Sequence, residues 1–299
     1  MNKLYTNWFA LGLAACLLVV GCASVQSPSA TTQESTPSAA VAPAKDQYTE
    51  QVAAGVAYFQ KRAKDQMPLV ENLLVALKSG DIDRAKQAYI DARPPYEEIE
   101  VYALSFEQED ADIDARPYAF PGGETDPDYR SIHKIESLIF RDSDLAAAVP
   151  YGEQLIESVK SLTTKLNEPA NFNSSLNYQG MLNLANEVPS KKISSEEETW
   201  SDQSLLIFKH NWIGIQSQFD PYKKLLPTNL VSEVDQAYKA CLATVEPFFT
   251  PGQVASKSYS SLDEKQRGAI VAASYRYRDA LVKARDALKI PEPPAEGEG

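Results

Sequence analysis

Apolar residues recur three and four positions apart along most of residues 46–290, and this period constrains the fold more than any other feature. The clearest case is the stretch 48–77, whose periodic apolar residues are Val52, Val56, Phe59, Leu69, Leu73 and Leu77. Such spacing places the apolar side chains on one face of an α-helix. No stretch of the sequence sustains the period-two alternation with β-branched residues that is typical of strands. The sequence therefore predicts an all-α fold.

The same period predicts the remaining helices. We expect them at about 82–106, 129–140, 151–166, 174–186, 196–219, 229–249 and 262–288. Successive helices of this kind predict two tandem up-and-down bundles that share an interface, at about 46–148 and 149–290.

Local signals refine these boundaries. Ser79-Gly80-Asp81 should end the first helix and cap the second. Proline lacks the backbone N–H, so we expect Pro68 to kink or restart the first helix and Pro94-Pro95 to interrupt the second. The stretch 110–129 is rich in acids, Pro and Gly, which predicts a long loop. Loops of that length are usually functional or disordered.

The N-terminus predicts export from the cytoplasm. Lys3 precedes a nearly continuous apolar run over 8–20, which is too short for a membrane span, so residues 1–21 are expected to be a signal peptide. Gly21-Cys22 follows this run and resembles the lipobox of bacterial lipoproteins, in which the Cys is lipidated. An ordinary signal peptide ending in a chance Cys is the alternative. We therefore expect a periplasmic or cell-envelope protein that Cys22 anchors to a membrane.

Composition separates the ends of the chain from its centre. Residues 22–45 are rich in Ser, Thr, Ala and Pro and predict a flexible tether, and the tail 291–299 is expected to be disordered. Cys241 lies in an apolar helical run and is expected to be a buried, inert thiol. The formal charge is −12, or −13 after loss of residues 1–21, whose only charged residue is Lys3. An acidic surface repels nucleic acid and is compatible with cation binding, although acidity alone mostly favours solubility.

Three polar patches are candidates for chemistry. Glu97 and Glu100 are three residues apart, so both carboxylates share one face of a helix. Asp114 and Arg116 belong to the acidic loop. His133 and Glu136 again have the i, i+3 spacing, and such pairs from two helices can converge on a metal inside a bundle.

Each patch also has a structural explanation. A single His-x-x-Glu arises often by chance, and the Glu97–Glu100 pair can be a solvated helical face. Asp114 can form a turn and Arg116 an ion pair. His133 is one of two histidines and lies on an otherwise apolar helix, but a structural His–Glu hydrogen bond would explain that too. The residues alone therefore indicate no more than a candidate metal site.

Several motifs together resemble the imelysin-like family, which includes EfeO-type periplasmic iron-uptake proteins. They are Tyr96-Glu97-Glu98-Ile99-Glu100, Ile113-Asp114-Ala115-Arg116, His133-Lys134-Ile135-Glu136 and Lys192-Ile193-Ser194-Ser195-Glu196-Glu197-Glu198. The resemblance covers nearly all of 46–290.

The resemblance implies a metal site at Glu97, Glu100, Asp114, His133 and Glu136, with Arg116 orienting or neutralising a carboxylate from outside the ligand set. Four carboxylates and one imidazole suit Fe³⁺ or Fe²⁺, with Zn²⁺ or Mn²⁺ as alternatives, and disfavour Cu⁺. The implied function is iron binding in an uptake system whose partners are an iron permease and a haem peroxidase.

The sequence departs from the family pattern in three places. The cupredoxin domain of longer EfeO proteins is replaced here by the tether, so copper chemistry is not expected. Pro117-Tyr118 follows the Ile-Asp-Ala-Arg stretch where acids are usual, and Arg130-Ser131-Ile132 stands where Thr-Gly-Phe often precedes the His.

Two other functions compete with iron uptake. A metallopeptidase is suggested by a peptidase label that the family also carries, but zinc peptidases commonly use His-Glu-x-x-His, and no second His lies near His133. His210 lies on another predicted helix, and Asn211-Trp212 beside it are predicted to be packing residues. A polysaccharide-binding protein would need a metal bridge to hold an anionic glycan, and the nearby aromatics are more simply core or loop anchors. Those aromatics are Tyr96, Tyr102, Tyr118, Phe120 and Tyr129.

Overall fold

The protein folds into α-helices joined by turns and by longer irregular segments. A computed structural model describes residues 46–194 and 197–292, and within these ranges it contains helices and no strand, apart from one isolated bridge between Phe249 and Ser256. The predicted all-α fold is therefore confirmed.

The described helices run as follows along the chain. They are α1 (Thr49–Ser79), α2 (Ile82–Ile99), α3 (Glu107–Asp114), α4 (Ile132–Glu136), α5 (Leu145–Lys165), α6 (Ser174–Ser190), α7 (Ser204–Phe219), α8 (Thr228–Val245) and α9 (Glu264–Leu288). Short 3₁₀ turns link several of them, including η1 (Glu100–Ser105) and η6 (Lys192–Ser194).

Capping residues explain where the main helices begin and end. Gly80 closes α1 in a left-handed conformation with φ of 76°, and the Asp81 side chain accepts a hydrogen bond from Arg84 N at the start of α2. This confirms the prediction for Ser79-Gly80-Asp81. Asp263 and Gln266 form a reciprocal capping box at the start of α9.

The prolines are the main departure from the expected helix pattern. Helix α1 does not restart at Pro68, and α2 continues through Pro94 and Pro95 to Ile99, so the predicted interruption is wrong. Both prolines of α2 are buried, and α2 packs against α1 and α7. Tertiary packing thus outweighs the loss of two intrahelical hydrogen bonds.

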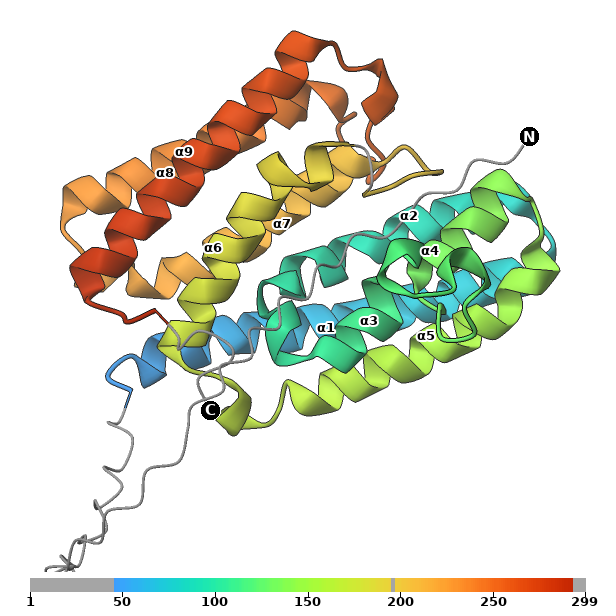
Figure 1. Cartoon of the computed structure of the whole chain (residues 1–299), viewed down its shortest axis with the longest axis horizontal. Coiled ribbons are helices and arrows are strands. Elements are labelled where there is room, and N and C mark those ends of the chain that lie inside the picture. Colours follow the sequence, from blue (N-terminus) through green and yellow to red (C-terminus); the bar gives the residue numbers. More distant parts are fainter. Residues whose placement is uncertain (1–45, 195–196, 293–299) are drawn as a thin grey trace, which may run out of the picture. The chain divides into compact units, whose positions relative to one another are not determined.

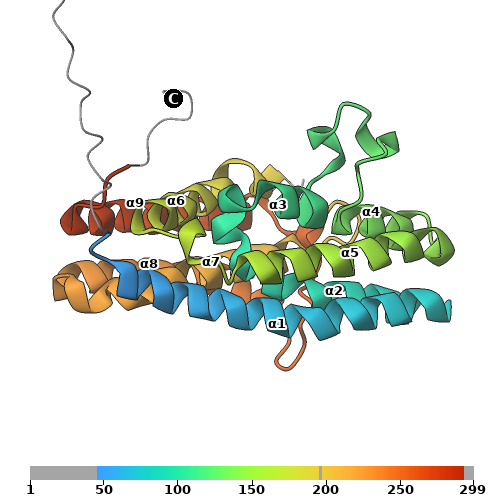
Figure 2. The same ribbon diagram turned by 90° about the horizontal axis from the view of Figure 1, so that it is seen from below.

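Two predicted boundaries near the acidic patches are also wrong. Residues 110–114 form the end of α3 and are not loop, because an acid-rich first turn suits a helix N-terminus. The irregular part is 115–131, whose middle stands away from the neighbouring helices in Figure 2. Helix α7 starts at Ser204 and not at 196, which leaves 197–203 as irregular chain.

The helices pack both against their neighbours in the chain and against helices distant in the sequence. Helix α1 lies against α2 and α5, α8 runs beside α9, and α9 contacts α6 (Figure 1). Helix α7 packs on both α2 and α8. It therefore connects the group formed by α1, α2 and α5 with the group formed by α6, α8 and α9. All described residues lie in one compact unit, Lys45–Gly299. The predicted division at 148/149 falls inside α5, and the division into two bundles stays a proposal.

Two glycines permit the close approaches that bring the candidate site together. A Cβ at Gly214 of α7 would lie 2.3 Å from the carbonyl oxygen of Glu98 at the end of α2. A Cβ at Gly180 of α6 would lie 1.8 Å from the carbonyl oxygen of Val101 in η1. Only a residue without a side chain allows these backbones to touch, so α7 packs directly on the end of α2 and α6 packs directly on η1.

Several predictions concern residues outside the described ranges. These are the signal peptide, Cys22, the tether at 22–45, Ser195, Glu196 and the tail from 293 onward. Cys241 is described, and it is buried and unpaired as predicted, with burial raising its thiol pKa to about 12. Among the described helices, none combines the length and apolar character needed to cross a bilayer.

Candidate metal centre

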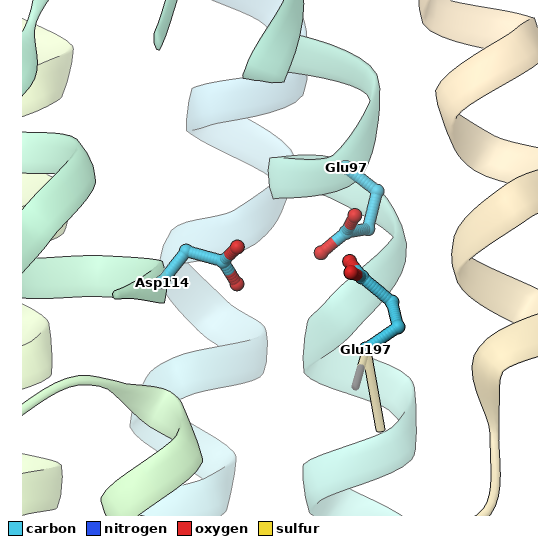
Figure 3. Close-up of side chains that lie close together, drawn as sticks. All are labelled: Glu97, Asp114 and Glu197. Carbon is cyan, nitrogen blue, oxygen red and sulfur yellow. The ribbon is translucent and has the colours of Figure 1, made fainter. Parts of the chain in front are cut away.

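Three buried carboxylates from distant parts of the chain converge beneath α6 and α7. Glu97 lies near the end of α2, Asp114 ends α3, and Glu197 follows η6. One oxygen of each lies within 4.8 Å of the others, and the three side chains point toward one another in Figure 3. Oxygen clusters of this kind are the ligands that hard cations prefer.

Arg93 balances much of this buried negative charge. It lies one turn before Glu97 on α2, and its side chain is 0% exposed. Its guanidinium nitrogens lie 2.6 Å from Glu97 Oε1, 2.8 Å from Asp114 Oδ1 and 2.7 Å from Glu198 Oε1. Arg116 is the second counter-charge, 2.7 Å from Glu197 Oε1 and 3.4 Å from Asp114 Oδ2.

His133 adds a nitrogen to the carboxylate group. Ser131 caps α4, which places His133 and Glu136 on one face, with Nδ1 of the ring 3.0 Å from Glu136 Oε2. Nε2, the other ring nitrogen, lies 3.3 Å from Asp114 Oδ1 but makes no hydrogen bond, although the side chain is only 2% exposed. A buried imidazole with one nitrogen oriented by a carboxylate and the other toward acidic oxygens is typical of metal-binding histidines.

Both oxygens of Glu136 are already engaged. Oε2 contacts His133, and Oε1 accepts hydrogen bonds from the backbone N–H groups of Trp200 at 2.9 Å and Ser201 at 2.8 Å. This geometry makes Glu136 an orienting residue for His133 and leaves it little capacity to contact an ion directly.

Glu100 lies on the other side of the acidic cluster. Both of its oxygens are 2.8 Å from Lys192 Nζ, and Asn211 of α7 donates to Oε2 at 2.7 Å. Asn211 also donates to Glu97 Oε2 at 3.0 Å, so one amide joins the two glutamates.

The irregular segment that carries Glu197 and Glu198 is held by the chain that precedes α9. The Tyr259 hydroxyl donates to the carbonyl of Ile193, and Tyr259 N donates to the carbonyl of Asp202 at 3.0 Å. The Asp202 carboxylate accepts from Ser260 N at 2.9 Å and from the Ser260 hydroxyl at 2.6 Å. Asp202 adopts a left-handed φ of 61°, which these bonds help to maintain.

A cavity of about 280 Å³ leads to the cluster from one side. Its wall contains polar site residues and, farther out, exposed Tyr118 and Lys191, so the cavity reaches the surface. The polar site residues in its wall are Glu100, Asp110, Asp114, Arg116, Lys192 and Glu197.

Burial and neighbouring charges divide the carboxylates into two groups. Burial raises the pKa of Glu97 well above its usual value, and it raises the pKa of Glu100 and of Glu198 to about 7. Burial would also raise the pKa of Asp114, but Arg93 and Arg116 hold it well below its usual range. The site therefore mixes firmly ionised acids with acids that readily hold a proton.

The pKa of His133 is also raised, but here neighbouring carboxylates cause the shift and burial opposes it. Burial lowers the pKa of an imidazole, but here the contacts with Asp114 and Glu136 favour its charged form and outweigh burial. Binding of a metal ion at Nε2 would therefore release a proton.

The structure assembles the sequence-derived candidates only in part. Asp114 lies beside both Glu97 and His133, whereas Glu100 and Glu136 face Lys192 and His133 respectively. Sequence reasoning did not identify the site residues Arg93, Lys192, Glu197, Glu198 and Asn211. Lys192, Glu197 and Glu198 belong to a motif that carried the family resemblance, which was the one available signal.

His210 lies in a second polar cluster, whereas its neighbour Asn211, predicted only to pack, donates hydrogen bonds to Glu97 and Glu100. The Nδ1 of His210 lies 2.6 Å from Glu98 Oε1, and Glu98 also contacts Arg62 at 2.7 Å and the Tyr58 hydroxyl. Glu97 and Glu98 therefore serve two separate polar clusters, because consecutive residues project from different faces of α2.

Four of the five aromatic residues near the site are core residues or loop anchors, and Tyr118 is the exception. Tyr96, Tyr102 and Tyr129 are buried, and the Phe120 ring packs 5.7 Å from that of Tyr129. Tyr118 is 71% exposed at the outer edge of the cavity.

The imelysin family (Peptidase_M75) matches residues 44–288 of the chain. The chain belongs to the imelysin family. Among its imelysin-like relatives is the iron uptake system component EfeO of Escherichia coli K12, which is 30% identical over 216 residues. EfeO proteins of Shigella flexneri and of E. coli O6:K15:H31 show the same identity over the same length. The match covers 71% of this chain and 57% of each relative, so the chain spans just over half the length of these EfeO proteins.

Proposed function

We propose that this protein binds iron outside the cytoplasm as a component of an EfeO-type uptake system. The observation that carries the proposal is the position of His133 Nε2. This nitrogen is buried, makes no hydrogen bond, and lies 3.3 Å from Asp114 Oδ1, whose carboxylate forms a close group with Glu97 and Glu197. An imidazole and three carboxylates form a mixed, oxygen-rich ligand set.

The chemistry of these donors fits iron. Carboxylate oxygens favour hard cations, and an imidazole also suits Fe²⁺ and Zn²⁺, whereas Cu⁺ prefers sulfur. Fe³⁺ or Fe²⁺, with Zn²⁺ or Mn²⁺ as alternatives, is therefore the proposed cargo. The name of the EfeO relatives, iron uptake system component, supports iron among these ions.

The geometry supports a revised assignment of roles within the proposed site. Glu97, Asp114, Glu197 and His133 are the proposed direct ligands, and Glu136 positions His133. Glu100 is paired with Lys192, and Arg116 balances Asp114 and Glu197. The proposal thus gives Arg116 the indirect role that the family resemblance implies.

Ion binding without catalysis is the better proposal for two reasons. The sequence around His133 lacks His-Glu-x-x-His, and Glu136, the acid closest to it, has both oxygens engaged and so is poorly placed as a general base. The relatives are also named for uptake and not for hydrolysis.

The rest of the proposed system follows from the relatives and the N-terminal sequence. An uptake component must pass its ion to a transporter, so an iron permease is the proposed partner, with a haem peroxidase as a further member. Lipidation at Cys22 would hold the domain at a membrane within the periplasm or cell envelope.

Metal analysis and titration calorimetry with Fe³⁺-citrate, Mn²⁺ and Zn²⁺ test the proposal. We expect one ion per chain, and we expect the double variant His133→Ala/Glu136→Ala to abolish its binding. The matched control is His210→Ala, because His210 also pairs with a glutamate through Nδ1 but lies outside the acidic cluster. Full affinity in the double variant, or loss of binding only in His210→Ala, would refute the assignment.

A further inference from the structure

Lys192 introduces a positive charge among the residues proposed to hold the ion. Its Nζ lies 2.8 Å from Glu197 Oε1 and 3.9 Å from Glu97 Oε2, and both of these carboxylates belong to the acidic group. The side chain is only 5% exposed, so water screens this charge poorly. Lys192 therefore interacts with oxygens that a bound cation would use.

Lys192 differs from the two arginines of the site in how it is held. Arg93 is fixed by carboxylates on three sides, and Arg116 bridges Asp114 and Glu197. Lys192 instead projects from the single turn η6, and its ammonium is a compact charge on a flexible stem.

Glu100 gives the ammonium a second place to bind. Both Glu100 oxygens lie 2.8 Å from Nζ, and Glu100 lies outside the acidic group of Glu97, Asp114 and Glu197. Lys192 can thus give up Glu197 and Glu97 and keep a carboxylate partner. It also lines the cavity through which the cluster is reached.

We propose that Lys192 is a tethered competitor of the bound cation, which lowers the affinity of the site and speeds release of the ion. The inference rests on the proposed function and extends it to the release step. When the ion binds, the ammonium withdraws to Glu100. When the ion leaves, the ammonium returns to Glu197 and Glu97, so the carboxylates do not remain exposed to one another. No covalent or redox step is involved.

The test compares Zn²⁺ binding to the metal-free full-length protein and to Lys192→Met, by calorimetry and by stopped-flow release to a chelator. Removing a unit charge about 4 Å from the ion should raise the affinity at least about tenfold and slow release by a similar factor. If Lys192 only held Glu197 in position, Lys192→Met would instead lower the Zn²⁺ affinity, because Glu197 would lose its partner.

Matched variants separate this effect from a change in net charge or in folding. Lys191→Met removes the neighbouring charge, which lines the same cavity but is 72% exposed and pairs with Glu187, and it should leave Zn²⁺ affinity unchanged. Lys192→Arg keeps the charge and should bind Zn²⁺ less tightly than Lys192→Met does. If Lys192→Met does not fold, Lys192→Gln provides the same comparison with a polar side chain.

The outcomes distinguish this inference from the proposed function. If His133→Ala binds Zn²⁺ as well as wild type does, the ion binds elsewhere and both proposals are overturned. If His133→Ala loses binding but removal of the Lys192 charge leaves affinity equal or lower, the competitor role alone is overturned. Tighter binding with slower release in Lys192→Met, but not in Lys191→Met, supports it.

Discussion

Glu136 holds the imidazole of His133 from one side, with Oε2 3.0 Å from Nδ1, while its Oε1 accepts the backbone N–H groups of Trp200 and Ser201. One carboxylate thus connects helix α4 to the chain entering α7. When the ring is neutral, this contact favours the tautomer in which Nδ1 carries the proton, which leaves the Nε2 lone pair for a metal ion.

Glu136→Gln should therefore weaken metal binding without removing a direct ligand. Its Oε can still accept the two backbone N–H groups, but its amide nitrogen would face Nδ1 and favour the tautomer with a proton on Nε2. We expect affinity to fall about 10–100-fold, as measured by calorimetry with Zn²⁺. Glu136→Ala should bind Zn²⁺ at least as weakly as Glu136→Gln does. Wild-type affinity in Glu136→Gln would show that the His133 tautomer does not matter for binding.

Replacing Arg93 should destabilise the metal-free protein strongly. Arg93→Met leaves Glu97, Asp114 and Glu198 buried without their shared counter-charge, which should lower the free energy of unfolding by about 3–5 kcal/mol. Urea denaturation in the presence of a chelator measures this loss. A saturating metal ion should restore part of it by supplying positive charge to Glu97 and Asp114.

The control for Arg93 is an exposed ion pair. Lys160→Met removes the partner of Glu157, which is 71% exposed, and should change the free energy of unfolding by less than about 1 kcal/mol. A similarly small change in Arg93→Met would contradict the view that the acidic cluster depends on this guanidinium.

The metal-free protein should lose stability as the pH rises from about 5 to about 8. Burial raises the pKa of Glu100 and of Glu198 to about 7, and that of Asp110 to about 6, from ordinary values of 4.5 and 3.8. Between these limits the folded state binds more protons than the unfolded state, so the free energy of unfolding falls with rising pH, by several kcal/mol in total. The raised pKa of His133 acts in the same direction.

Urea denaturation in the presence of a chelator, at about pH 5 and about pH 8, measures how the free energy of unfolding changes with pH. Glu198→Gln removes one of the titrating groups and should make the free energy of unfolding less dependent on pH. A bound metal ion should also reduce this pH dependence, because the ion stabilises ionised carboxylates. A metal-free protein that is equally stable or more stable at the higher pH would contradict the prediction.

Gly214→Ala should destabilise the fold at the contact between α7 and α2. The added methyl would lie 2.3 Å from the Glu98 carbonyl oxygen, so the helices would have to move apart, at a cost of about 3 kcal/mol. Gly268→Ala is the matched control, since Gly268 is an exposed residue of α9 with no atom within 4 Å of the added Cβ. It should stabilise the protein by about 0.5–1 kcal/mol. Equal thermal denaturation midpoints for the two variants would refute the close approach.

Local sequence patterns determined much of the helical structure. The apolar period identified the long helices, and Ser79-Gly80-Asp81 marked the junction of α1 and α2, because these signals depend on residues within one or two helical turns. The i, i+3 spacing of His133 and Glu136 likewise placed both side chains on one face. The prolines of α2 misled the prediction because their effect depends on packing against other helices.

Only the tertiary structure decided which side chains meet. Glu197 lies 83 residues after Asp114 in the chain, in an irregular segment with no helical period, yet their carboxylates share one buried cluster. Arg93 precedes Glu97 by one helical turn, but the pairing of Arg93 with Asp114 and of Lys192 with Glu100 joins elements that are distant in the sequence. Helix period is a property of neighbouring residues, whereas this cluster depends on the packing of distant elements, including the close approach of Gly214 in α7 to Glu98 and of Gly180 in α6 to Val101.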